Sequence, residues 1–218
     1  MLYSGYQAWA HSTAAFRIAA RQALRLRDPL GPVGDSPLPR NAFAWLDVFA
    51  GARVTHERPD FGIESVMVGN QELVVREEIT TALPFCNLVH FAKDDLETPQ
   101  PKMLVVAPLS GHFATLLRGT IRTLLRDHDV YVTDWANARD VPTAEGRFGF
   151  DDYIDYVIRF LEEIGPRAHV FAVCQPCVQT LAAVALMAED KNPAQPRTMT
   201  LMGGPIDTRQ APTAVNDL

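Results

Sequence analysis

Hydrophobic residues in the second half of the chain fall into short unbroken runs, separated by longer stretches of mixed polarity. Short apolar runs bounded by polar or turn residues are typical of strands that are buried on both faces of a sheet. The longer stretches repeat apolar residues three and four positions apart, which predicts helices. The pattern predicts strands at 103–107, 130–134, 170–173 and 198–202, with helices at 113–126, 150–164 and 178–189 between them.

Strands also precede this region, but their pattern is that of antiparallel pairs. Residues 63–68 and 73–81 flank Gly69-Asn70, a strong signal for a two-residue hairpin turn, and a further apolar run at 82–92 predicts another strand. Antiparallel strands followed by alternating strands and helices predict an α/β fold with a mostly parallel sheet of the α/β-hydrolase type. Such a sheet normally has two more strand–helix units, so we expect this one to be incomplete, ending after 198–202.

The N-terminal part of the chain predicts helices instead of strands. Apolar side chains recur near one face over residues 2–24, while arginines from Arg17 onward line another face. Prolines and glycines at 29–39 predict a linker. A second helix is expected at 41–50, with Asn41 as its cap.

These patterns divide the chain into an N-terminal helical arm, residues 1–55, and an α/β core, residues 56–218. We expect the arm to pack against the core or to form the contact of a homodimer. Residues 1–27 carry four arginines and no acidic residue, which loosely resembles an organellar transit peptide. A packed amphipathic helix explains the same pattern more simply.

Composition and charge exclude several classes of protein. The chain has 218 residues, 47% of them hydrophobic, which is enough for one domain with a sizeable core. Its formal net charge of −6 argues against a nucleic-acid partner, because there is no basic excess to neutralise phosphates. No apolar run is long enough to predict a transmembrane segment, and the N-terminus lacks the pattern of a secretory signal.

Cysteine is used sparingly. Three cysteines, an odd and low number, predict no disulfide framework and suit a reducing cytoplasm. Cys174 and Cys177 form a C-x-x-C pair, but a zinc site needs two further ligands and the sequence offers no second motif that would supply them. The tryptophan that precedes a thioredoxin-like pair is also missing. We therefore expect no metal and no cofactor.

The most informative segment is the strand at 170–173, which ends at Cys174 and turns at once into a helix. In α/β-hydrolases this tight turn lifts the nucleophile above the sheet, and the residues two before and two after it are usually glycine. Here these flanking residues are Ala172 and Pro176, and proline suits the first turn of a helix. Cys177 is the weaker alternative because it would lie inside the helix. A thiolate at position 174 would attack an ester carbonyl, whereas a buried structural cysteine is the alternative interpretation.

An oxyanion hole is expected beside this cysteine. Its donors should be the backbone N–H of Gln175, directly after the nucleophile, and that of Ser110, in the loop after the strand at 103–107. The small Gly111 allows backbone to approach a substrate there. We expect Gly111 and His112 to line the same cleft.

The other members of a catalytic triad are not identified. Asp134 and Trp135 end the strand at 130–134, where cleft residues gather, although a helix cap or a salt bridge would also explain Asp134. Asp207 follows the last strand and is a candidate acid, or else a turn residue. His169 is the last histidine in the sequence, yet a hydrolase of this type carries its general base after the nucleophile.

Several ordered motifs resemble one known family. They are Pro108-Leu-Ser-Gly-His-Phe-Ala-Thr-Leu-Leu-Arg-Gly-Thr120, Val132-Thr-Asp-Trp135, Phe150-Asp-Asp-Tyr-Ile-Asp-Tyr156, Val173-Cys-Gln-Pro176 and Gly203-Gly-Pro-Ile-Asp-Thr-Arg209. The chain is similar in these motifs to the N-terminal portion of intracellular polyhydroxyalkanoate (polyhydroxybutyrate) depolymerases. The resemblance implies an α/β-hydrolase with Cys174 as nucleophile that degrades storage polyester granules in the cytoplasm. Family members are roughly twice this length, and their triad Asp and His have no counterpart here.

Three functions remain open at this point. The first is hydrolysis of a poly(3-hydroxybutyrate)-type polyester or of hydroxyalkanoate oligomers. The second is acyl transfer as in polyester synthases, which also use a cysteine at this turn but usually keep the flanking glycines. The third is a non-catalytic, granule-associated or dimerising module, or a fragment, that lacks the triad histidine.

Overall fold

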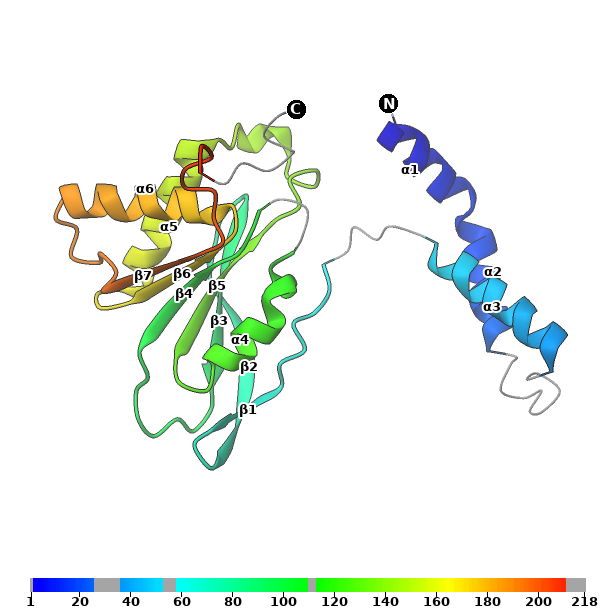
Figure 1. The fold of residues 1–218 in the computed structure, drawn as a ribbon, viewed down its shortest axis with the longest axis horizontal. Helices are drawn as coiled ribbons and strands as arrows, with labels where there is room; N and C mark the ends of the chain where they lie inside the picture. The colour runs from blue at the N-terminus through cyan, green and yellow to red at the C-terminus, as the bar shows by residue number, and fades with distance from the viewer. Residues whose placement is uncertain (1, 26–35, 53–57, 110–112, 211–218) are drawn as a thin grey trace. The chain divides into compact units, whose positions relative to one another are not determined.

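The protein is described by a computed structural model that covers residues 2–25, 36–52, 58–109 and 113–210 (Figure 1). The chain divides into two compact units, residues 1–57 and residues 58–218. The boundary expected between residues 55 and 56 lies outside the described residues. Within the described ranges, no helix is long and apolar enough to cross a membrane.

The first unit is helical, but its helices differ from those expected. The continuous helix predicted over residues 2–24 is two helices, α1 (Leu2–Ser12) and α2 (Ala14–Leu24). The break falls at Thr13, whose hydroxyl donates a 2.7 Å hydrogen bond to the Trp9 carbonyl oxygen. A side chain that bonds to the preceding turn in this way competes with the helix.

The third helix, α3 (Pro37–Gly51), begins four residues earlier than predicted. A proline has no N–H to lose in the first turn of a helix, so residues 37–39 are helical instead of belonging to the linker. Asn41 consequently lies inside α3 and does not cap it. The remainder of the predicted linker up to residue 35 lies outside the described residues.

Arg17 also departs from the expected pattern. Its side chain is buried, donating to the Thr13 hydroxyl and to the Ala10 carbonyl, with the guanidinium carbon 5.7 Å from the centre of the Trp9 ring. The hydrophobic pattern placed this arginine on a face other than the apolar one. The aliphatic stem of an arginine can pack like an apolar side chain, which explains the difference.

The second unit contains a seven-stranded sheet in the order β1-β2-β3-β5-β4-β6-β7. Its strands are β1 (Ser65–Val68), β2 (Gln71–Ala82), β3 (Cys86–Lys93), β4 (Lys102–Val106), β5 (Asp129–Trp135), β6 (His169–Val173) and β7 (Thr198–Met202). The pairs β1–β2, β2–β3 and β3–β5 are antiparallel, and the pairs among β4, β5, β6 and β7 are parallel. Each predicted strand is present.

The predicted hairpin is confirmed in detail. Val68 pairs with Gln71, which leaves Gly69-Asn70 as a two-residue turn. Gly69 has a φ of +60°, which a type II′ turn requires at its first central residue and which glycine adopts without strain.

Three helices connect the parallel strands: α4 (Arg118–Leu124), α5 (Phe150–Ile164) and α6 (Pro176–Glu189). The predicted helix at 113–126 begins as a 3₁₀ turn, Ala114–Leu117, and α6 begins two residues earlier than expected because Pro176 occupies its first turn. Right-handed crossovers place α4 on one face of the sheet, because β5 lies on one side of β4. The chain then moves in the other direction along the sheet, from β5 to β6 and from β6 to β7, so right-handed crossovers place α5 and α6 on the opposite face. Figure 1 shows these two helices next to each other.

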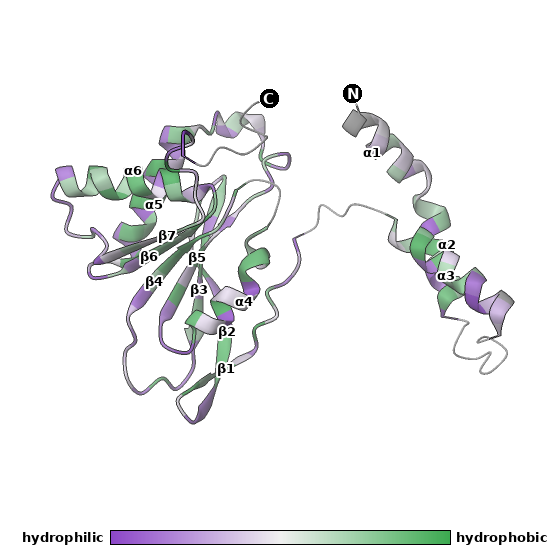
Figure 2. Ribbon diagram, viewed as in Figure 1, coloured by the Kyte–Doolittle hydropathy of each residue, from purple (hydrophilic) through white to green (hydrophobic). Residues whose placement is uncertain are grey.

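The core fills the space between these layers. The central strands are largely buried, with Leu104, Val105, Val130 and Val132 completely inaccessible to solvent. Such strands carry apolar residues on both faces, which is the pattern that made them recognisable in the sequence. Figure 2 shows α6 coloured as hydrophobic along most of its length.

Candidate active site

The chain connectivity creates a topological switch point between β4 and β6. β4 and β6 are neighbours, yet the helices that follow them leave toward opposite faces. Ligands of open α/β sheets bind outside the carboxyl ends of the strands at such a switch point. Ala107 follows β4 at this edge and Cys174 follows β6, so both border the same region.

Cys174 occupies the turn between β6 and α6 and is exposed. Its φ is +66°, a conformation that costs a residue with a Cβ roughly 1–3 kcal/mol. Two backbone hydrogen bonds hold the turn: the Cys174 N–H donates to the Met202 carbonyl at 2.8 Å, and the Cys177 N–H donates to the Cys174 carbonyl at 3.1 Å. A strained residue at a strand-to-helix turn is the geometry of a nucleophile elbow.

Cys177, the alternative nucleophile, is buried in the first turn of α6. Its Sγ lies 3.4 Å from the Ala172 carbonyl oxygen and 3.6 Å from that of Met202. Burial raises the pKa of the Cys177 thiol and so disfavours its nucleophilic thiolate form. Exposure and geometry therefore both favour Cys174 over Cys177 as the reactive thiol.

The segment after β7 packs directly against this turn through Gly204. A Cβ at position 204 would lie 2.1 Å from the Cβ of Cys177, 2.5 Å from its Sγ and 2.8 Å from the Cys174 carbonyl oxygen. Only a glycine fits there. Sequence analysis missed this role because a Gly-Gly pair after a strand is also an ordinary turn signal.

Of the two expected oxyanion donors, Gln175 lies in the described part of the chain. Gln175 has helical backbone angles (φ −49°, ψ −42°), and its N–H has no acceptor within the part of the chain that the structure describes. Pro176 follows it and has no N–H, so the Gln175 amide is the first donor at this end of α6. Ser110, Gly111 and His112 lie outside the described residues, and their parts in the cleft remain predictions.

The end of β4 is held in place by side chains that the sequence analysis did not single out. The Ala107 N–H donates to the Thr133 hydroxyl at 2.9 Å. The Ala107 carbonyl accepts from the Trp135 indole N–H at 2.9 Å and from the Tyr153 hydroxyl at 3.3 Å. These three buried partners fix the backbone that leads into the loop at 108–113. In the sequence, the sign that could have indicated this role of Thr133 was a hydroxyl group in a strand made mostly of apolar residues.

Asp134 is buried beside the same edge, with 7% of its surface exposed. Its Oδ2 accepts from the Nε of Arg58 at 2.7 Å, and its Oδ1 has no partner among the described residues. Burial raises the pKa of the Asp134 carboxyl, while Arg58 opposes that shift. The salt bridge that the sequence left open for Asp134 is therefore present. Trp135 is likewise buried, and lining of the cleft by Asp134 and Trp135 remains a prediction.

The described histidines of the second unit lie away from Cys174. His169 begins β6, so it lies about 17 Å along the strand from Cys174. The rings of His128 and His169 are 6.5 Å apart, and His90 bonds to Asp129, which begins the parallel strand β5. All three therefore lie toward the amino ends of the parallel strands. No described histidine is hydrogen-bonded to the Cys174 thiol.

Asp207, the candidate acid after the last strand, is engaged locally. It accepts from the backbone N–H of Arg209 at 3.1 Å and from its guanidinium at 2.8 and 3.0 Å. These bonds lower the pKa of the Asp207 carboxyl. The arrangement corresponds to the turn-residue alternative.

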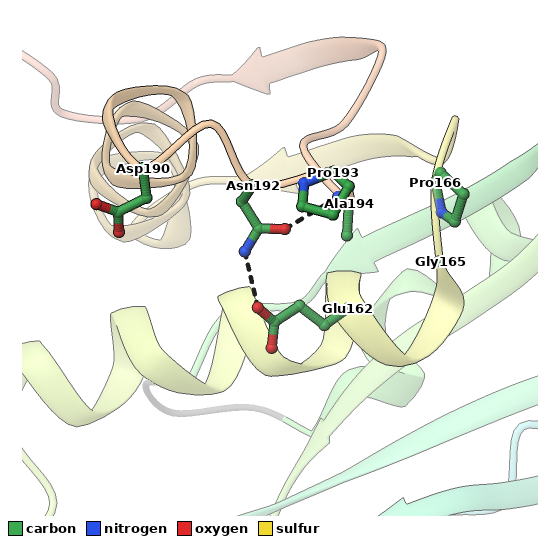
Figure 3. Close-up of a pocket in the computed structure, with 7 residues that line it drawn as sticks. All are labelled: Glu162, Gly165, Pro166, Asp190, Asn192, Pro193 and Ala194. Atoms are coloured by element: carbon green, nitrogen blue, oxygen red, sulfur yellow. Dashed lines mark hydrogen bonds between the residues drawn. The ribbon is translucent and has the colours of Figure 1, made fainter.

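A pocket of about 450 Å³ lies elsewhere, between the end of α5 and the loop that follows α6 (Figure 3). The Asn192 side chain crosses it, donating to the Glu162 carboxylate at 2.7 Å. Gly165 and Ala194, which also line it, precede β6 and β7. The pocket is therefore at the amino edge of the sheet, opposite Cys174. No group of three or more His, Cys, Asp or Glu residues in the described ranges is arranged to hold a metal ion.

The comparisons with known proteins found similar solved structures but no match to a family model or to a curated sequence. Similar solved structures include naproxen esterase from Bacillus subtilis (13% identity, TM-score 0.39, covering 58% of this chain and 42% of that one). They also include brefeldin A esterase, a bacterial homologue of human hormone-sensitive lipase (14%, 0.40, 67% and 42%), and a thermostable esterase from Pseudomonas putida (16%, 0.39, 82% and 56%). The chain spans about half the length of these structures.

Strand order, helix placement and the elbow together define the class of the second unit. It is an α/β fold of the α/β-hydrolase type, with a mostly parallel sheet and Cys174 at the turn between β6 and α6. The fold class expected from the sequence is thus confirmed.

Proposed function

We propose that Cys174 is the nucleophile of an ester hydrolase. The observation that carries this proposal is an exposed thiol on a strained turn, followed directly by an N–H that has no acceptor within the described residues. A thiol is a weak nucleophile until it loses its proton, so the proposed reaction needs a base to accept that proton. A catalytic role for Cys174 would explain why the chain keeps a turn that costs conformational free energy.

The proposed reaction proceeds through a thioester. The Cys174 sulfur attacks the ester carbonyl carbon, and the carbonyl oxygen gains negative charge that the Gln175 N–H stabilises. Collapse of this intermediate expels the alcohol, which takes up the proton lost by the thiol. Water then attacks the thioester, releasing the free acid and restoring the thiol. A histidine base transfers the protons in both steps, as the resemblance to the depolymerases implies.

The proposed substrate is a poly(3-hydroxybutyrate)-type polyester or its hydroxyalkanoate oligomers. Support comes from the motifs that resemble intracellular polyhydroxyalkanoate depolymerases, among them Val173-Cys-Gln-Pro176 at the elbow itself. Ser110 is proposed as the second oxyanion donor, with Gly111, His112, Asp134 and Trp135 lining the cleft. The proposed location is the cytoplasm, at the surface of storage granules.

Acylation by an activated ester tests the chemistry separately from the substrate. The chain is incubated with p-nitrophenyl 3-hydroxybutyrate, with and without imidazole as an external base, and the intact mass is measured. We expect one acyl group on Cys174, formed faster with imidazole, and none on Cys174→Ala. Cys177→Ala is the matched control and should still be acylated. Equal acylation of Cys174→Ala would overturn the proposal.

Release of free acid tests the substrate and separates hydrolysis from acyl transfer. Amorphous poly(3-hydroxybutyrate) should yield soluble 3-hydroxybutyrate or oligomers. A polyester synthase would instead lengthen chains from a hydroxyacyl-CoA, and chain growth without acid release would assign acyl transfer. Neither activity, combined with a Cys174 thiol that no activated ester acylates, would assign a non-catalytic module.

A further inference from the structure

The helical first unit leaves large apolar side chains uncovered by its own helices. The exposed fractions are 75% for Trp45, 69% for Phe16, 64% for Val48, 57% for Ile18 and 45% for Trp9. A helix pair of this size usually buries its aromatic residues, because each contributes a large apolar area. Large apolar side chains that stay exposed next to one another on a helix face mark a site of interaction.

The exposed residues are separate from the side that joins the helices. On α3, Phe43, Leu46 and Ala50 follow helical spacing and are at least partly buried. Trp45 and Val48 are three residues apart and therefore share a second face of the same helix. Figure 2 shows hydrophobic positions along both α2 and α3. The apolar character of α3 is thus greater than its packing against α2 requires.

Charge distinguishes this unit from the rest of the chain. Residues 1–57 hold six arginines, no lysine and four acidic residues, a formal charge of +2. Residues 58–218 hold 14 basic and 22 acidic residues, a formal charge of −8. Arg21, Arg25 and Arg40 are all exposed on the helical unit. An asymmetry of this kind between two parts of a chain points to an anionic partner for the positive part.

We propose that the helical unit binds an anionic lipid surface, with Trp45 and Val48 inserted between the acyl chains. Helices that lie in such an interface combine tryptophan, phenylalanine and aliphatic residues on one face with arginines that contact the headgroups. This combination of chemistry is present here, and it favours a lipid surface over a second copy, whose helical unit would carry the same positive charge. The proposal does not rest on the chemistry of Cys174.

Vesicle co-sedimentation of the full chain tests this binding. One set of vesicles contains phosphatidylcholine alone, and the other also contains about 30 mol% phosphatidylglycerol. The second set has a negatively charged surface, which attracts arginines. We expect at least ~10-fold tighter binding to the anionic vesicles, weakened when salt rises from about 0.05 M to about 0.5 M. Equal binding to both vesicles, or binding to neither, overturns the proposal.

Substitutions assign the binding to the named residues. The variant Trp45→Ser/Val48→Ser should lose most of the affinity, and Arg21→Gln/Arg25→Gln should lose most of the salt dependence. The matched control is Val74→Ser/Ile79→Ser, which removes two exposed apolar residues from the second unit. Binding that survives Trp45→Ser/Val48→Ser overturns the proposal. So does a dimer in sedimentation equilibrium that the same substitutions dissociate, because the face would then belong to a second copy.

Cys174→Ala separates the two proposals. Its vesicle binding should equal that of the unaltered chain, while its acylation is lost. A chain that binds vesicles but is not acylated therefore contradicts only the hydrolase proposal. A chain that is acylated but does not bind vesicles contradicts only the lipid-binding proposal.

Discussion

Gly204 and Cys177 are in direct contact, and the space between them is too small for any side chain at position 204. The Cβ of an alanine would lie 2.1 Å from the Cβ of Cys177, well inside the distance at which carbon atoms repel each other. Through this contact, the segment after β7 supports the first turn of α6 and hence the turn that presents Cys174.

Gly204→Ala is expected to destabilise the fold by about 1–3 kcal/mol, the usual cost of overfilling a packed site. The backbone has to move away from Cys177, because the nearest atoms are a Cβ and a carbonyl oxygen and not the end of a flexible side chain. Urea unfolding measures the loss. Gly119→Ala is the control, since nothing lies within 4 Å of its added methyl group, and it should not reduce stability. A Gly204→Ala variant as stable as this control would contradict the described packing.

At position 174, glycine should be more stable than alanine by about 1 kcal/mol, because a φ of +66° strains any residue with a Cβ. The reverse order is expected at Gln175, where φ is −49° and glycine only adds flexibility to the unfolded chain. Thermal unfolding of the four variants, Cys174→Gly, Cys174→Ala, Gln175→Gly and Gln175→Ala, makes the comparison. A preference for alanine at both positions would mean that Cys174 is not strained.

Removal of Arg58 should leave the buried Asp134 without a cation. We expect Arg58→Ala to cost about 2 kcal/mol at neutral pH, less than for a fully buried pair because the Arg58 side chain is 32% exposed. The deficit should shrink in acid, where Asp134 is protonated. Arg76→Ala is the control: Arg76 pairs with Asp94 at 2.7 Å on the surface, and its loss should cost clearly less because solvent screens an exposed pair. Equal effects of the two substitutions would show that the Arg58–Asp134 pair is not a buried interaction.

Stability should rise with pH above about 8 because of Lys93. Burial lowers the pKa of this amine from 10.5 to about 8, although it donates to the carbonyl oxygens of Leu125 at 2.8 Å and His128 at 2.5 Å. Between these two pKa values the unfolded chain binds more protons than the folded one, so the free energy of unfolding increases with pH. Chemical unfolding at several pH values between 8 and 10 measures the slope. Lys93→Met should flatten it, and an unchanged slope in that variant would contradict the assignment.

The fold was largely predictable because its central strands are buried on both faces. Unbroken apolar runs placed β7 at its observed residues and the other parallel strands within a residue or two. Helix ends were less predictable, since Pro37 and Pro176 begin helices at points where proline usually signals a break. The division at Thr13 accompanies a side-chain hydrogen bond to the Trp9 carbonyl, which hydrophobic spacing does not register.

Only the part of the site that lies within a short stretch of sequence was predictable. A strand that ends in a cysteine and turns into a helix is visible in ten consecutive residues, so Cys174 and Gln175 could be named from the sequence. The contacts of Ala107 with Trp135 and Tyr153, and the pairing of Arg58 with Asp134, join residues 28 or more positions apart. Such contacts follow from the order of strands in the sheet, which single-sequence patterns specify only loosely.

Because β4 and β6 are neighbours whose following helices leave toward opposite faces, the location of the proposed site is a property of chain connectivity and not of any one side chain. On the proposed function, exchanging the residues around Cys174 would alter which ester is accepted without moving the site. A directed-evolution library confined to the segments that follow these two strands would therefore explore new selectivity while leaving the scaffold intact.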